Sequence, residues 1–234
     1  MRKIIYLFLG VFVLTTVLSC DNELLEEVVP EELTEAEIIS GLKEALNVGI
    51  QNGADKANLL DGYFKNALIK ILFPPEAIAV KNAVNDIYPQ MVTDLELSLN
   101  RAAESAAKKS KPIFFSAITS MTIQDAKNIL NGGDSLAATS YLKKSTSDTL
   151  QYLYKPDIKK ALDSVSATKY WSDIITVYNG LTGESVNTDL PEYTTLKALD
   201  GLFYLVGQEE IKIRKDPVAR ISDILKKVFG SLDK

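Results

Sequence analysis

Histidine is absent from the 234-residue chain, and cysteine occurs only at Cys20. Without histidine the chain has neither a Ser-His-Asp nor a Cys-His nucleophile system, and it lacks the usual ligands of zinc. A single cysteine also excludes a disulfide within the chain. The side chains that remain for chemistry are carboxylates, arginines and tyrosines, and we expect neither a metal centre nor a cofactor.

Phosphate-binding loops and basic stripes are missing as well. Neither GxxxxGK[ST] nor GxGxxG occurs, so the sequence gives no support for a nucleotide role. The net charge is -5, whereas nucleic-acid binding depends on a clustered basic surface. We therefore expect no nucleic-acid partner.

The first nineteen residues have the pattern of a lipoprotein signal peptide. Arg2 and Lys3 precede an apolar run over residues 4–18, which is shorter than the roughly 20 residues of a membrane-spanning helix. The run ends in Leu18-Ser19-Cys20, which resembles the lipobox of bacterial lipoproteins. We predict that residues 1–19 are removed and that Cys20 is acylated, for instance with palmitate, and holds the protein at the outer membrane, on its periplasmic or surface face. An ordinary secretory signal with a chance cysteine is the alternative.

An acidic segment follows the cysteine. Residues 21–37 contain eight acidic residues, no basic one, and Pro30, a composition that predicts a solvated tether over residues 20–37. Residues 38–234 are numerous enough for one domain with a substantial core. Because no internal repeat or linker divides them, we expect a single all-α, bundle-like domain of several helices.

Capping signals and apolar periodicity place the helices. Thr34 with Glu37, and Thr122 with Asp125, form capping boxes. Helices are predicted from Thr34 to a weak end at Gly49 and Gly53, and over 76–88, 89–109, 113–121, 123–131, 135–153, 157–165, 169–179, 191–214 and 216–230, with a break near Pro156 and with Asp216 as the last N-cap. The apolar segment 59–73 lacks periodicity, and 69–73 is the one place where the sequence would allow a short extended piece or strand.

An apolar helical stripe near the C-terminus runs directly into charged residues. The stripe comprises Leu199, Leu202, Phe203 and Val206. Continuing it by three and four residues places Glu209 and Glu210 on the same face, and Arg214 follows Glu210 by four. Carboxylates are costly to bury unless they are paired, so the fold must bring partners to them or open a cleft above them.

Two interpretations of the charged residues stay open. The candidate functional residues are Asn100, Arg101, Glu104, Asp125, Glu209, Glu210, Arg214 and Arg220. In one interpretation the glutamates act as acid and base, or as oxygen ligands of Ca²⁺ or Mg²⁺. In the other, the arginines neutralise the glutamates in a structural network. Tyr170 and Trp171 form an aromatic patch that either stacks on a ligand or belongs to the core.

Several short motifs in a fixed order carry a family resemblance. They lie at 100–104 (NRAAE), 112–114 (PIF), 121–126, 137–141, 170–171 (YW) and 209–214. The chain resembles the bacterial family called domain of unknown function 4197 over residues 41–230, and the resemblance implies an exported protein of unassigned activity. Because these motifs contain the charged residues of the apolar stripes, we hypothesise that Arg101, Glu104, Glu209, Glu210 and Arg214 converge in space.

Two functions are consistent with the sequence. The first is a lipid-anchored, non-catalytic module of the cell envelope that holds a partner protein or a small or lipid-like ligand in a groove between helices. The alternative is a carboxylate-dependent envelope hydrolase, acting on glycan or peptide through Glu209 and Glu210. The absence of histidine favours the first function. Carboxylates that line an open pocket would favour the second, and carboxylates that are paired and sealed would favour the first.

Overall fold

A computed structural model describes residues 32–183, 186 and 188–233, and its compact unit begins at Leu33. The predicted signal peptide, Cys20 and most of the predicted tether lie outside the described residues. Within them no helix is long and apolar enough to cross a membrane.

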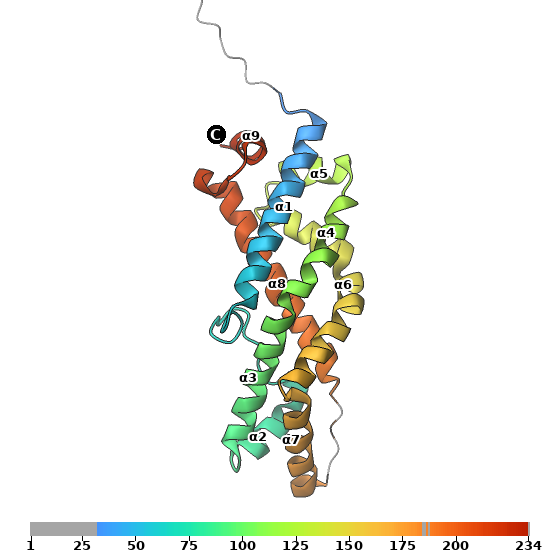
Figure 1. The fold of residues 1–234 in the computed structure, drawn as a ribbon. Coiled ribbons are helices and arrows are strands. Elements are labelled where there is room, and N and C mark those ends of the chain that lie inside the picture. Colours follow the sequence, from blue (N-terminus) through green and yellow to red (C-terminus); the bar gives the residue numbers. More distant parts are fainter. Residues whose placement is uncertain (1–31, 184–185, 187, 234) are drawn as a thin grey trace, which may run out of the picture. The chain divides into compact units, whose positions relative to one another are not determined.

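The described chain is helical and contains no strand, which confirms the all-α prediction (Figure 1). Its elements are α1 (Glu35–Asn58), η1 (Pro75–Ala77), α2 (Ile78–Asn85), α3 (Pro89–Ala106), η2 (Ala107–Ser110), α4 (Lys111–Thr119), α5 (Ile123–Asn131), α6 (Ala137–Ser164), α7 (Ala167–Thr182), α8 (Leu190–Lys215), η3 (Pro217–Ala219) and α9 (Asp223–Gly230). Both predicted capping boxes are formed, at Thr34 and at Thr122. Because α1 begins at Glu35, the last three residues of the predicted 20–37 tether belong to this helix.

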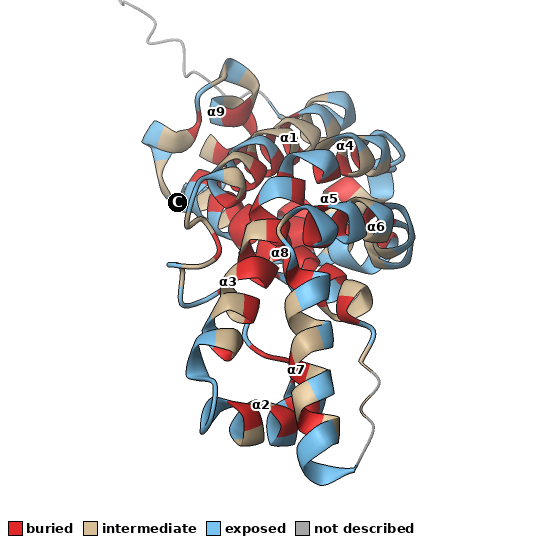
Figure 2. Cartoon of the chain, turned by 60° about the horizontal axis from the view of Figure 1, so that its bottom comes forward, coloured by how far each residue is buried: buried red, intermediate tan, exposed pale blue. Residues whose placement is uncertain are grey.

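Helices α1 and α8 lie at the centre of the bundle. Helix α1 packs against α8, α9, α5, α4 and α3, and α6 packs against α8, α3 and α4. Figure 2 shows the buried residues gathered on the sides of α1, α6 and α8 that face one another. We had expected a weak helix end at Gly49 and Gly53, but α1 continues through both to Asn58. A Cβ atom at Gly53 would lie 3.3 Å from the backbone nitrogen of Val206, so the missing side chain lets α1 approach α8 closely.

The predicted break near Pro156 is wrong, because α6 continues through it to Ser164. Proline removes one helical hydrogen bond and strains the preceding turn. Tyr154 and Ile158, on either side of Pro156, are fully buried, and α6 packs against α3 and α8. Tertiary packing therefore overrides the local preference for a helix end.

The last predicted helix, 216–230, is divided in two. The Asp216 side chain accepts a hydrogen bond from the backbone of Val218 and starts the short helix η3, whereas α9 begins only at Asp223, with Ser222 as its N-cap. Arg220 lies between them and is 3% exposed. Its guanidinium donates to the carbonyl oxygens of Ile213 and Arg214, 3.0 Å away in each case. Arg220 thereby satisfies carbonyl groups at the C-terminal end of α8, which ordinarily lack helical partners.

Candidate functional site

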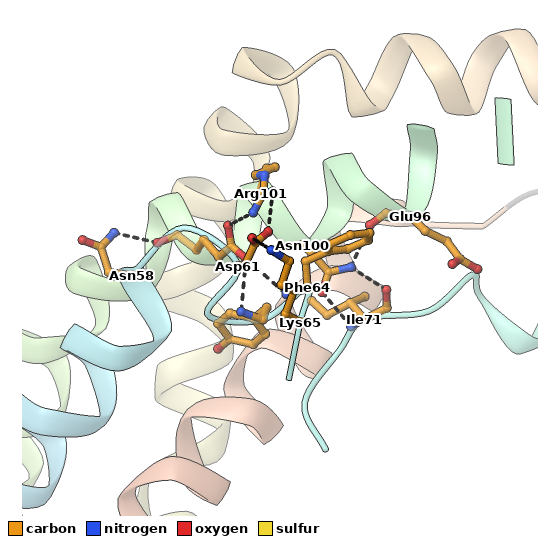
Figure 3. A network of polar contacts seen from close by, with 10 residues as sticks. Asn58, Asp61, Phe64, Lys65, Ile71, Glu96, Asn100 and Arg101 are labelled. Carbon is orange, nitrogen blue, oxygen red and sulfur yellow. Dashed lines mark hydrogen bonds and ion pairs between the residues drawn. The ribbon is translucent and has the colours of Figure 1, made fainter. Parts of the chain in front are cut away.

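A row of polar side chains on α3 holds the connection between α1 and η1. Glu96, Asn100 and Glu104 are spaced by four residues, so they share one face of the helix. The buried Asn100 amide accepts a hydrogen bond from the Ile71 N–H at 2.9 Å and donates to the Ile71 carbonyl at 2.7 Å (Figure 3). These two bonds are what a neighbouring strand would supply. Residues 69–73, the one place where a strand was allowed, form none: Ile69 lies in a turn bonded to the Asn66 carbonyl, and Asn100 satisfies the backbone of Ile71.

Glu104 and Arg101 hold the preceding turn of the same connection. One Glu104 carboxylate oxygen accepts hydrogen bonds from the Tyr63 and Phe64 N–H groups, at 3.1 and 3.2 Å. Its other oxygen accepts from Arg101 at 2.6 Å. Arg101 also donates to Asp61 at 2.7 Å, and Asp61 has a positive φ of 66°. The ion pairs on Glu104 and Asp61 thus fix a turn in which Asp61 is left-handed, a conformation largely confined to glycine, asparagine and aspartate.

The connection is fixed again at its far end. Glu96 accepts hydrogen bonds from the Phe73 N–H at 3.3 Å and from Lys81 at 2.7 Å. On the opposite side, the Tyr193 hydroxyl of α8 donates to the Leu72 carbonyl at 3.0 Å. The α3 side chains thus bind backbone, and none of these contacts leaves Glu104 or Asn100 open to a ligand.

Glu210 caps helix α6 from across the bundle. Its carboxylate accepts hydrogen bonds from the N–H groups of Ala138 and Thr139, at 2.9 and 2.7 Å, and from the Thr139 hydroxyl at 2.7 Å. Leu136, the N-cap residue of α6, provides no side-chain cap of its own. Arg214 completes the set with an Nε contact of 3.0 Å. The predicted i,i+4 pair therefore exists, and it serves a helix N-terminus, where negative charge is favourable.

Glu209 has a separate set of partners on α1. Its carboxylate accepts hydrogen bonds from Asn52, at 2.9 Å, and from Lys56. Burial alone would raise the pKa of Glu209, but the hydrogen bonds from Lys56 and Asn52 outweigh burial and hold the pKa below its usual value. Glu209 is therefore a charged link between α1 and α8.

The charged residues form separate sets of contacts. Arg101 is paired with Glu104 and Arg214 with Glu210, whereas Glu209 bonds to Asn52 and Lys56, and within the described chain no hydrogen bond or ion pair joins one set to another. Arg220, which we had expected to neutralise a glutamate, binds the Asp233 carboxylate instead. Asp125 caps α5 and accepts a hydrogen bond from the Tyr141 hydroxyl at 3.1 Å.

The aromatic pair is partly buried and packs against the core. The Trp171 ring lies 5.7 Å from the Phe73 ring, measured between centroids, with the planes inclined by 55°. Tyr170 is half-buried beside it. Trp171 therefore packs against Phe73 at the end of the α1–η1 connection, in agreement with the core interpretation.

A groove that the sequence did not indicate lies on the outer side of this connection. Its volume is about 650 Å³, and residues 68–75, α2 and α8 enclose it. Another hollow, of about 610 Å³, lies beside Pro156 between α6 and α8. None of the three buried glutamates lines either hollow. The described residues also contain no group of three or more side chains able to hold a metal ion.

The fold and these contacts define an all-α domain in which Asn100, Glu104 and Glu210 bind backbone groups and Glu209 binds side chains of α1. A family described as "Protein of unknown function (DUF4197)" matches residues 32–230, and the chain belongs to this family. The match contains every motif on which the resemblance rested, from 100–104 to 209–214, and confirms it. No curated protein and no solved structure matches the chain.

Proposed function

We propose that the chain is a non-catalytic binding module of the cell envelope, anchored by lipid and using a groove between helices. One observation carries the proposal: the buried carboxylates are saturated by partners within the protein. Glu104, Glu209 and Glu210 each expose 5% or less of their surface. A general acid or base must come within hydrogen-bond reach of the substrate proton. Because these glutamates line neither hollow, they cannot reach a substrate there, and we assign them a structural role.

A turnover assay separates binding from hydrolysis. The full chain and a Glu209→Gln/Glu210→Gln variant are incubated with cell-wall peptidoglycan, and new reducing ends and new amino termini are measured. We expect neither protein to release product above a no-protein blank. Cleavage by the parent that is lost in a folded glutamine variant would establish the alternative, a carboxylate-dependent hydrolase acting on glycan or peptide.

The anchoring part of the proposal rests on the pattern at residues 1–20. Changing Cys20 to Ser removes the thiol that would be acylated, and we expect the protein to leave the membrane fraction. The measurement is fractionation after high-salt and carbonate washes, with mass spectrometry of the N-terminal peptide. A Cys20→Ser protein that remains in the washed membranes would show that another element holds it there.

A further inference from the structure

We propose that the groove of residues 68–75, α2 and α8 binds a single-chain amphiphile with an anionic headgroup, and that Lys70 and Lys197 hold the headgroup. The proposal names the ligand class of the binding role given above and rests on it. The acyl chain lies on the aliphatic lining, and the carboxylate or phosphate at its end meets the two cations.

Part of the groove lining consists of exposed aliphatic side chains. Leu68, Leu72 and Ile78 are 71%, 54% and 50% exposed, although each is a large apolar side chain. Single exposed leucines are ordinary, but apolar side chains gathered on one concave surface mark a binding site. The groove volume of 650 Å³ lies within the range of about 300 to 1,000 Å³ that small-molecule sites occupy.

The contacts of α3 hold the segment that forms one wall of the groove. In residues 69–73, Ile69, Ile71 and Phe73 are buried, whereas Leu72 is exposed and Lys70 half-buried. By pairing with both backbone groups of Ile71, Asn100 holds this segment in place (Figure 3). Buried and exposed residues of the segment together line the groove.

The groove lining carries more positive than negative side chains, which favours an anionic ligand. Its lining includes Lys70, Lys81 and Lys197, with Asp200 as the one acidic residue. Lys143 binds Asp200 at 2.8 Å, and Lys81 is paired with Glu96.

Lys70 and Lys197 therefore remain as available cations. Lys70 lies 4.3 Å from the centre of the Phe64 ring, and among the described residues no carboxylate comes within ion-pair distance of either lysine. A positive, apolar hollow in a chain of net charge -5 is complementary to an amphiphilic anion.

A photo-crosslinking experiment tests the site on the full chain in its own membranes. Membranes are incubated with a diazirine analogue of palmitic acid, irradiated, and the adducts mapped by mass spectrometry. We expect adducts to be enriched in peptides covering residues 68–78 and 193–201. Unlabelled palmitate and a lysophospholipid with a phosphate headgroup should both compete, and the stronger competitor identifies the natural headgroup. A neutral monoacylglycerol should compete weakly, and competition equal to that of palmitate would overturn the anionic assignment.

Charge reversal supplies the matched comparison. Lys70→Glu/Lys197→Glu should lower groove labelling about tenfold, which corresponds to about 1.4 kcal/mol of lost interaction. Lys108→Glu/Lys144→Glu changes the net charge equally at exposed positions away from the groove, and labelling should be unchanged. Melting curves check that both variants fold.

Adducts spread evenly along the chain, or equal labelling of the two charge-reversed variants, would refute the site. That result would leave the non-catalytic role intact, because only carboxylate-dependent cleavage of peptidoglycan overturns it.

Discussion

Replacing Glu210 by alanine is the sharpest test of the buried charge network. The substitution removes the acceptor for the N–H groups of Ala138 and Thr139 and leaves the Arg214 guanidinium without its carboxylate. The Arg214 side chain is only 9% exposed, so water replaces the lost contact poorly. The structural interpretation therefore predicts a large loss of stability.

The magnitude follows from these contacts. Breaking one side of a buried ion pair costs about 3 to 5 kcal/mol, and we base the expected loss on this term alone. For a chain of this size each kcal/mol lowers the melting temperature by about 2 to 4 °C. We expect Glu210→Ala to melt about 6 to 20 °C below the parent. The melting temperature of Glu210→Gln should lie between those of Glu210→Ala and the parent, because the glutamine amide oxygen still accepts one of the hydrogen bonds.

The assay is thermal unfolding of the purified chain, followed by circular dichroism at 222 nm. Glu76→Ala is the control, since Glu76 is exposed, and a surface substitution should change stability by no more than about 0.5 kcal/mol. If Glu210→Ala melts within about 1 °C of the parent, the carboxylate does not cap α6, and our reading of the C-terminal stripe fails.

Two further predictions concern packing and pH. Gly201→Ala should lower stability by about 1 to 3 kcal/mol in urea unfolding, because its Cβ would lie 2.6 Å from the Tyr63 ring. Gly180→Ala, where nothing lies within 4 Å, should be neutral or stabilising, and equal effects at the two glycines would contradict the packing argument. Hydrogen bonds, chiefly from Lys227, lower the pKa of Glu37 from 4.5 to about 2. A depressed folded-state pKa stabilises above pH 4.5, and the contribution is lost as pH falls towards 2, so Glu37→Gln should lose less stability than the parent over this interval.

The sequence predicted the features that depend on neighbouring residues. The capping boxes at Thr34 and Thr122 join residues three positions apart, and both are present. The burial of Glu209 and Glu210 followed from helical spacing alone and is also confirmed. Such features need only local geometry, which the sequence specifies directly.

Features that depend on distant partners could not be predicted. Glu210 binds donors on α6 that are 71 and 72 residues away, and Asn100 pairs with a residue 29 positions earlier. No spacing rule relates such positions, so the expected single cluster proved to be separate contacts. The groove was missed for the same reason: its lining joins an apolar segment without periodicity to α2 and to α8, which lies more than 100 residues later in the chain.

The central position of α1 has a consequence for how the chain folds. Helix α1 is synthesised early, yet its main neighbour α8 comes late, and the Asn52–Glu209 contact spans 157 residues. Contacts between distant segments slow folding, because a long loop must close before they can form. The apolar face of α1 that packs against α8 therefore stays exposed until the C-terminal helices have been synthesised. A chain truncated before α8 should therefore leave that face uncovered and aggregate.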